Sequence, residues 1–299
     1  MPTSLIVGCG YLGRRVASLL LERGGVVYGT TRNPDKARRL AEMGVRPMLV
    51  HVTQPLTLAA LVPALDAPHL DVYYMVPPGR PDRSPSPRQT VLGGIGHVVK
   101  ALRGAKVRRG VLVSSTAVYG QRGGEVVDAD TPAKPIEERG RLLLDGERLW
   151  QESGEARHVV RLAGLYGPGR VIGRRALESG APLVGDPRAL LNLVHVEDAA
   201  RLLVAVMDAE HPGQVEVGCD GHPVARERYY EHLAGLLNVS PPTVLDDARA
   251  AAQLGVDMAR LRLVSSKALD NGVTCRRTGW QVRFSTFREG LDSALAGRG

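Results

Sequence analysis

A glycine-rich turn lies near the start of the chain and could bind phosphate groups. Residues 8–13 read GCGYLG, a GxGxxG spacing between a short apolar run and a segment with helical periodicity. In this spacing the first glycine permits a tight turn, the second lets the backbone approach a pyrophosphate, and the third lets the helix pack closely on the strand. The helix N-terminus would direct its N–H groups and the positive end of its dipole toward the phosphates. The motif therefore predicts a dinucleotide site formed by Gly8, Gly10, Tyr11, Leu12 and Gly13.

The residues after the second apolar run bear on which dinucleotide would bind. An Asp or Glu there would hydrogen-bond the ribose 2′-hydroxyl of NAD, but residues 29–32 read GTTR. Arg32 could pair with the 2′-phosphate of NADP, and Thr30 and Thr31 could donate hydrogen bonds to it. The sequence therefore favours NADP and leaves NAD possible, with a solvated Arg32 as the alternative.

Strand-like runs that alternate with helical patterns must position these residues. Short apolar runs with little polar alternation predict strands covered on both faces, at 4–7, 26–28, 47–50, 72–76, 110–114, 158–162 and 215–217. Helical patterns occur at 11–23, after Asn33-Pro34-Asp35, and at 194–207, 226–237 and 286–295. The segment 194–207 begins as the end of a strand and continues as a helix. The polar stretch 268–278 is expected to be a break between elements. The alternation predicts an α/β fold, a Rossmann-type doubly wound parallel sheet with a smaller C-terminal α/β lobe. We expect the sheet domain at 1–168, with 190–215 returning to it, and the small lobe at 169–189 and 216–299.

Further motifs carry a family resemblance over nearly the whole chain. Residues 113–120 read VSSTAVYG, 161–169 read RLAGLYGPG, 192–200 read NLVHVEDAA, and GW at 279–280 is followed by EGL at 289–291. In this order they resemble the NAD(P)-dependent epimerase/dehydratase family of extended short-chain dehydrogenases/reductases. The resemblance implies that Ser115 touches the substrate and that 161–169 closes over the nicotinamide. It also implies cofactor contacts from His51, Val76, Pro77 and Ser114, although a backbone-bonded His51 is equally plausible.

The chain departs from this family at the residues that carry its chemistry. The family pairs a Tyr with a Lys four residues later on one helical face, and these positions fall on Arg139 and Leu143. Arginine stays protonated and cannot act as acid or base, but it can bind an anion or polarise a carbonyl. We therefore expect an atypical catalytic site in which Ser115 orients the substrate, Arg139 stabilises negative charge and Tyr166 is a substitute proton donor. Tyr119 is an alternative donor, and Glu137 and Glu138 could serve as bases.

Two functions follow from these features. The first is an NADP-dependent enzyme of the epimerase, dehydratase or reductase type that acts on a sugar nucleotide or another polar carbonyl compound. The second is an inactive dinucleotide-binding redox sensor or scaffold. The resemblance also implies a homodimer, paired through helices at 88–103 and 136–151.

Composition argues against several other classes of protein. The formal net charge is +8, but the 34 arginines and five lysines are scattered among acidic residues and only 4% of the residues are aromatic, which argues against a nucleic-acid partner. No apolar run approaches the roughly 18 residues that span a bilayer, so no membrane association is expected. No residues have metal-ligand spacing, and three widely separated cysteines suit a reducing cytoplasm. We expect a cytoplasmic protein without a metal.

Overall fold

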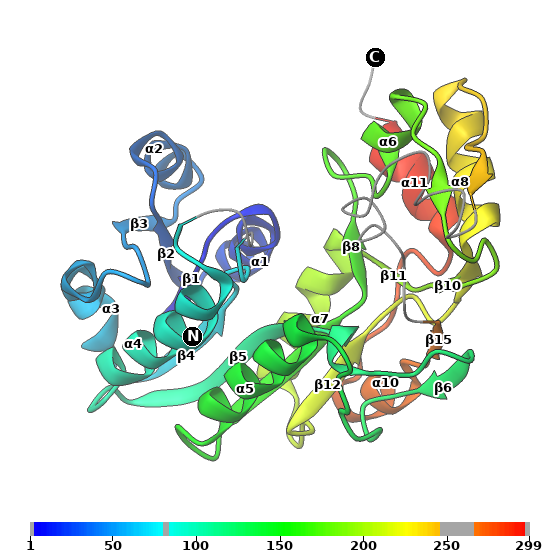
Figure 1. Cartoon of the computed structure of the whole chain (residues 1–299). Helices are drawn as coiled ribbons and strands as arrows, with labels where there is room; N and C mark the ends of the chain where they lie inside the picture. The colour runs from blue at the N-terminus through cyan, green and yellow to red at the C-terminus, as the bar shows by residue number, and fades with distance from the viewer. Residues whose placement is uncertain (1–2, 80–83, 246–265, 297–299) are drawn as a thin grey trace.

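Seven parallel strands form a central sheet in the order β12-β7-β5-β4-β1-β2-β3. The structure is a computed structural model that describes residues 3–79, 84–245 and 266–296. The strands of the sheet are β1 (Thr3–Val7), β2 (Val26–Thr31), β3 (Arg46–Leu49), β4 (Leu70–Tyr74), β5 (Val107–Ser115), β7 (Arg157–Leu162) and β12 (Val215–Gly218). The strand order reverses between β1 and β4, and ligands of open α/β sheets bind at such a point, beyond the carboxyl ends of the strands. The predicted Rossmann-type fold is confirmed (Figure 1).

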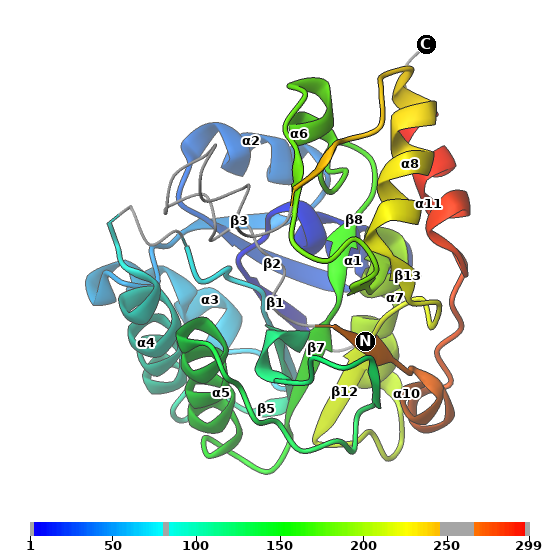
Figure 2. The ribbon, with the colours of Figure 1, turned by 45° about the vertical axis from the view of Figure 1, so that its right-hand side comes forward.

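Helices cover both faces of this sheet. On one face α4 (Gly94–Ala101) packs beside α5 (Glu138–Gln151), and on the other α1 (Tyr11–Glu22) packs against α7 (Val196–Asp208) (Figure 2). Shorter elements on the sheet are α2 (Pro34–Glu42), α3 (Val62–Leu65) and the helical turns η1 (Pro55–Leu61), η2 (Gln89–Gly93) and η3 (Thr116–Val118). None of the helices in the described ranges is long and apolar enough to cross a membrane.

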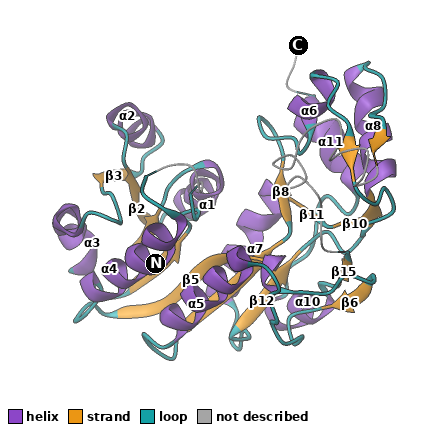
Figure 3. Cartoon of the chain, in the orientation of Figure 1, coloured by secondary structure: helices purple, strands orange, loops and turns teal. Residues whose placement is uncertain are grey.

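A smaller lobe lies beside the sheet (Figure 3). It has a hydrophobic core of its own. Its helices are α6 (Arg174–Glu178), α8 (Arg226–Leu237) and α11 (Phe287–Leu295). Its strands pair as β8 (Gly164–Tyr166) with β11 (Leu193–His195), β10 (Leu190–Leu191) with β13 (Val224–Ala225), and β9 (Leu183–Val184) with β14 (Val244–Leu245). The centre of this core is formed by Tyr166, Leu177, Tyr229, Leu233, Phe287 and Leu291.

Local capping signals explain where two of the helices begin. The Asn33 side chain accepts a hydrogen bond of 2.9 Å from the backbone N–H of Lys36, and Pro34 occupies the first position of α2, as the sequence predicts. Thr286 and Glu289 form a reciprocal capping box at the start of α11. These contacts satisfy N–H groups that a helix end leaves without intrahelical partners.

Strand β12 lies farther into the main sheet than the sequence suggests. It pairs in parallel with β7 along its whole length, from Val215 to Gly218. Residues 216–218 therefore belong to the sheet and not to the lobe that was expected to begin at 216. Conversely, β8, β10 and β11 fall within the ranges expected for the sheet domain but lie outside the seven-stranded sheet. Periodicity could not place this boundary, because the strand is short and its next residues stay buried as the chain leaves the sheet.

The polar stretch 268–278 is structured, and the prediction of a break there is wrong. It contains most of β15 (Lys267–Leu269), which pairs in parallel with β6 (Glu125–Val127), and then α10 (Gly272–Thr278). α10 packs on β12, where the fully buried Thr274 hydroxyl accepts a hydrogen bond of 2.9 Å from the backbone N–H of Val217. A short helix that buries a threonine lacks the apolar periodicity that sequence analysis relies on.

The segments expected to pair two copies of the chain form neighbouring helices. Residues 88–103 contain η2 and α4, and residues 136–151 contain α5. α4 and α5 contact each other on one face of the sheet. The homodimer itself stays a prediction.

Candidate active site

The glycine turn after β1 has the shape that a bound diphosphate requires. Gly8 has a φ of +91°, in the left-handed region that favours glycine. Its N–H donates a hydrogen bond of 2.8 Å to the Thr30 hydroxyl oxygen, and the N–H of Cys9 donates one of 2.9 Å to the Thr30 carbonyl. The turn is therefore held against the carboxyl end of β2 before any ligand binds.

The end of β4 borders the same turn. A Cβ atom on Gly8 would lie 3.0 Å from backbone atoms of Met75 and Val76, so no side chain fits there. Val76 is half-buried and Pro77 is exposed, directly beyond β4. The two residues predicted to contact the cofactor are thus placed at the point where the strand order reverses.

The start of α1 leaves its N-terminal N–H groups without a side-chain cap. Gly10 stands at the cap position with no capping hydrogen bond, and the first turn has no acidic residue. Gly13 lets the helix approach the strand, because a Cβ atom there would lie 2.9 Å from the Gly8 carbonyl oxygen. An uncapped helix start above a glycine cradle fits the diphosphate of a dinucleotide.

Tyr11 and Leu12 can contribute to the dinucleotide site through their backbone N–H groups more readily than through their side chains. Leu12 is buried in the main core, and Tyr11 is half-buried with its hydroxyl shielded from solvent. The guanidinium carbon of Arg15 lies 4.3 Å from the centre of the Tyr11 ring, and that of Arg170 lies 5.8 Å from it. Arg15 forms an ion pair of 2.8 Å with Glu197, so its charge is already balanced, and Arg170 is the cation that favours an anion here.

Thr30 has a different role from the one that the sequence predicts. Its side chain is 3% exposed, and its hydroxyl is occupied by the Gly8 N–H. The prediction that Thr30 donates to a 2′-phosphate is wrong, because its side chain is buried and shapes the glycine turn. Thr31 is half-buried and accepts a hydrogen bond of 3.3 Å from the Asn33 N–H. Its contact with the cofactor stays a prediction.

Arg32 and His51 meet beyond the ends of β2 and β3. Their Nη1 and Nε2 atoms are 3.4 Å apart, and the other ring nitrogen of His51 lies 2.9 Å from the Thr53 hydroxyl. Burial and the Arg32 charge lower the pKa of His51. The structure therefore brings a permanent cation and a neutral imidazole together at the sheet edge, and the side chain of His51 bonds to other side chains, not to the backbone.

Ser115 and Arg139 lie near the same end of α5. Ser115 is half-buried at the end of β5, where its hydroxyl caps η3 by accepting from the Ala117 N–H at 3.3 Å. Arg139 is exposed in the first turn of α5. This turn rests on η3, because a Cβ atom on Gly140 would lie 2.5 Å from the Ala117 carbonyl oxygen. The sequence of α5 contains neither tyrosine nor lysine.

A buried ionic network lies beside these residues. The Glu147 carboxylate receives hydrogen bonds from the Ser114 hydroxyl at 2.5 Å and from Nη2 of Arg161 at 2.7 Å. Arg161 Nη1 also donates to the Tyr119 hydroxyl at 3.0 Å, and that hydroxyl donates to the Asp128 carbonyl. The Ser114 hydroxyl proton is committed to Glu147, so its side chain cannot donate it to the cofactor, and contact through the Ser114 backbone stays a prediction. The Tyr119 hydroxyl likewise donates its proton to the Asp128 carbonyl, so Tyr119 cannot serve as the alternative proton donor.

Tyr166 lies in the core of the small lobe. Its side chain is fully buried, and its ring meets that of His195 edge-to-face with centroids 5.4 Å apart. A Cβ atom on Gly290 of α11 would lie only 1.8 Å from the Tyr166 hydroxyl oxygen. Burial raises the pKa of this phenol. The prediction that Tyr166 donates a proton to the substrate is wrong, because α11 seals its hydroxyl away from any ligand.

Replacing Tyr166 with Phe should therefore leave cofactor affinity and turnover unchanged. Among the residues that the structure describes, the buried hydroxyl has no hydrogen-bond partner, so its removal should be neutral or should raise stability by up to about 1 kcal/mol. Thermal unfolding and nucleotide titration of Y166F check this. Gly290→Ala is the opposing control and should lower the melting midpoint, since its methyl group would collide with the phenol. A folded Y166F protein that binds nucleotide but loses turnover would restore the catalytic assignment.

Lys267 is a candidate that sequence analysis missed. It lies on β15 with 5% of its surface exposed, and its Nζ donates a hydrogen bond of 3.2 Å to the Tyr119 carbonyl oxygen. Tyr119 caps the C-terminal end of the η3 turn, and Ser115 caps its N-terminal end. No motif marks this lysine, because its partner lies 148 residues away in the chain and only the fold brings the two together.

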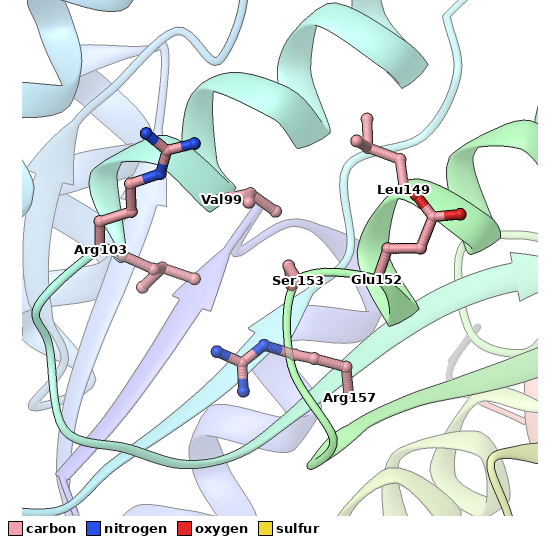
Figure 4. A pocket seen from close by; sticks show the side chains of 7 residues that line it. Val99, Arg103, Leu149, Glu152, Ser153 and Arg157 are labelled. Atoms are coloured by element: carbon pink, nitrogen blue, oxygen red, sulfur yellow. The ribbon is translucent and has the colours of Figure 1, made fainter.

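A separate cavity of about 350 Å³ opens between the C-terminal ends of α4 and α5 (Figure 4). Arg103 and Leu149 line it together with Arg157, the first residue of β7. It lies at the amino end of the strands, whereas the glycine turn follows the carboxyl end of β1. The cavity is therefore not part of the dinucleotide site. Within the described ranges, no group of three or more His, Cys, Asp or Glu side chains could hold a metal ion.

Comparison with known proteins agrees with this geometry. The model of the NAD dependent epimerase/dehydratase family matches residues 4–218. Protein YeeZ of Escherichia coli (strain K12) is 30% identical over 272 residues, which cover 86% of this chain and 96% of YeeZ. The 3-diazoavenalumate denitrifying reductase of a Streptomyces species is 26% identical over 300 residues, which cover 96% and 98% of the two chains. A functionally unknown conserved protein from Silicibacter pomeroyi has a solved structure with 30% identity and a TM-score of 0.79, and the match covers 99% of both chains. The chain belongs to the NAD dependent epimerase/dehydratase family.

Proposed function

We propose that this protein binds NADPH and uses it to reduce a polar carbonyl compound, such as a keto sugar nucleotide. The observation that carries the proposal is the preformed cradle of the glycine turn. There the Gly8 N–H is fixed by Thr30 at 2.8 Å, and the uncapped start of α1 follows directly. A cradle built before the ligand arrives costs little further ordering on binding.

The residues of α5 can stabilise negative charge on a substrate oxygen but supply no base. Oxidising an alcohol requires a base that takes the hydroxyl proton. Arg139 stays protonated, and Leu143 is buried in the core, so neither can be this base. Reducing a carbonyl requires stabilisation of the negative charge that develops on its oxygen, which hydrogen-bond donors and cations can supply. The relative from Streptomyces is itself named a reductase.

The chain's own residues would bind and orient the substrate. The nicotinamide, when bound in its reduced form, supplies a hydride. Ser115 can donate a hydrogen bond to the substrate oxygen, because its hydroxyl uses a lone pair for the Ala117 N–H and retains its proton. Arg139 is exposed at the same end of α5 and can pair with an anionic group of the substrate.

The preference for NADP rests on the edge formed by β2 and β3. Arg32 is exposed there, 3.4 Å from His51, and residues 29–32 contain no acid that would hydrogen-bond a ribose 2′-hydroxyl. A 2′-phosphate would form charge-assisted hydrogen bonds with Arg32. The family model is named for NAD, so the proposed preference for NADP rests on the chain's own residues.

A nucleotide titration followed by a turnover assay tests the proposal. Protein freed of bound nucleotide would be titrated with NADPH and NADH by nicotinamide fluorescence, and then assayed for NADPH oxidation with aldehydes, ketones and phenanthrenequinone. We expect tighter binding of NADPH and turnover of at least one carbonyl compound. Tight binding without any turnover would favour a cofactor-bound sensor or scaffold. If neither nucleotide bound, the cofactor proposal would fail.

A further inference from the structure

We propose that Lys267 is a catalytic residue, whose ammonium group holds the substrate oxygen and protonates it in place of the tyrosine–lysine pair that α5 lacks. This inference rests on the proposed function, because it assigns the proton donor for carbonyl reduction. The argument uses where the lysine lies, how β15 holds it and which charges face it.

Lys267 is set apart from the other lysines by its burial. Lys36, Lys100, Lys106 and Lys134 are exposed, whereas Lys267 is 5% exposed. An ammonium group has three N–H donors, and burial is costly for each donor left without an acceptor. Within the described residues, Lys267 Nζ has one hydrogen bond, to the Tyr119 carbonyl at 3.2 Å. This bond uses one of the three donors of Nζ, and the proposal assigns the substrate oxygen to another.

The backbone of β15 is fixed from two sides, so the lysine is preorganised. The Asn192 side chain donates to the Lys267 carbonyl at 2.8 Å and accepts from the Leu269 N–H at 2.8 Å. On the other side β15 pairs with β6, where Lys267 lies opposite Glu125. A donor held in place before the reaction needs little reorganisation when charge develops.

This position lies beside the residues already assigned to the substrate. Tyr119, whose carbonyl holds Nζ, ends the η3 turn that Ser115 caps. The first turn of α5 rests on η3 through Gly140, and it carries Arg139 where the family has its tyrosine. The fold thus brings a lysine from the far end of the chain to the turn against which the start of α5 packs.

The charges around Lys267 leave it able to give up a proton. Burial lowers the pKa of its ammonium group, and the nearby Glu137 carboxylate opposes this only in part. Glu125 lies opposite in the strand register, but its carboxylate accepts from the Gly123 N–H at 2.8 Å. A lysine with a lowered pKa is a better proton donor at neutral pH than an ordinary one.

The proposed step is balanced for a two-electron reduction. The carbonyl carbon of the substrate accepts a hydride, and the electron pair of the C=O π bond moves to the oxygen. A proton from Lys267 Nζ then completes the hydroxyl group, leaving a neutral amine that takes a proton from water. The reductant is NADPH, the cofactor of the proposed function.

The first test observes the lysine without any turnover. The chain has five lysines, so labelling them with carbon-13 at Cε gives five NMR signals, and Lys267→Arg assigns the buried one. We expect this signal to titrate at lower pH than the other four and to shift when NADP⁺ is added. A Lys267 signal that stays unchanged in protein that binds NADP⁺ would overturn the inference and leave the proposed function intact.

The second test measures turnover with the carbonyl compound found active. Lys267→Met should lower kcat about a hundredfold or more, with nucleotide affinity retained. Activity of the native protein should fall as pH rises through the lowered pKa of Lys267, and Lys267→Arg should lower kcat as Lys267→Met does, because an arginine keeps its proton. Lys134→Met removes an exposed lysine and is the matched control, expected to behave like the native protein. Undiminished kcat in Lys267→Met would exclude the proposed role. Failure of the native protein to bind NADPH would instead refute the proposed function.

Discussion

Replacing Glu147 with Leu should destabilise the protein by about 3 to 5 kcal/mol, because it leaves a buried arginine without its counter-charge. The side chains of Arg161 and Glu147 are 6% and 1% exposed, and their charged groups are 2.7 Å apart. The same carboxylate accepts the Ser114 hydroxyl, which would also lose its partner. We expect the melting midpoint to fall by roughly 10 °C, measured by calorimetry with matched denaturant titrations.

A double variant separates the charge effect from the effect of lost packing. Glu147→Leu combined with Arg161→Met removes both charges and keeps apolar volume, so it should be less destabilising than Glu147→Leu alone. The Tyr119 hydroxyl keeps its hydrogen bond to the Asp128 carbonyl in both variants. If the double variant were at least as unstable as the sum of the single ones, the uncompensated charge would not be the cause.

Replacing Arg32 with Ala should weaken NADPH binding about 10- to 100-fold and leave NADH binding unchanged. The expected loss is that of a charge-assisted hydrogen bond, about 1.5 to 3 kcal/mol, and each 1.4 kcal/mol is about tenfold in affinity. Arg32 is exposed and bonds only weakly to His51, so its removal should not disturb the fold. Fluorescence titration with the two nucleotides measures the effect.

Arg39→Ala is the matched control for this change. It removes the same charge from the exposed surface of α2, away from the edge where Arg32 meets His51. It should change the affinities for both nucleotides equally and slightly. Equal losses for NADPH and NADH in Arg32→Ala would mean that Arg32 does not contact a 2′-phosphate.

The pH dependence of binding offers a further check on this edge. The lowered pKa of His51 keeps its ring neutral near pH 7 in the free protein. A 2′-phosphate beside the ring would raise that pKa, so NADPH binding would take up a proton. NADPH affinity should therefore increase as pH falls, whereas NADH affinity should not. A parallel pH dependence for the two nucleotides would place the phosphate elsewhere.

The fold and the cofactor cradle could be predicted because their signals are local. The apolar runs 4–7 in β1 and 110–114 in β5 are almost wholly buried, and burial on both faces of a sheet requires apolar residues at successive positions. A glycine is required at position 8 because the turn has a positive φ there. Asn33 suits the start of α2 because its side chain accepts a hydrogen bond from the N–H of Lys36, three residues along the chain. Contacts of this kind involve residues that are close together in the sequence, so sequence patterns can predict them.

The roles of the polar side chains could not be predicted in the same way. Ser114, Thr30 and Tyr166 have residue types suited to a site, but each is buried and occupied or sealed by a residue far along the chain. Whether a hydroxyl faces a ligand or a core depends on packing that sequence spacing does not encode.

The sequence by itself determined the parallel α/β architecture, the phosphate-binding turn and the absence of tyrosine and lysine from the helix at 138–151. Only the tertiary structure decided which polar groups remain available at the site. It joined Arg32 to His51 and carried Lys267 to the Tyr119 carbonyl, 148 residues away. The physical reason is that propensity and periodicity depend on residues close together in the sequence. Burial and charge pairing depend on segments that are distant in the sequence and come into contact only in the folded protein.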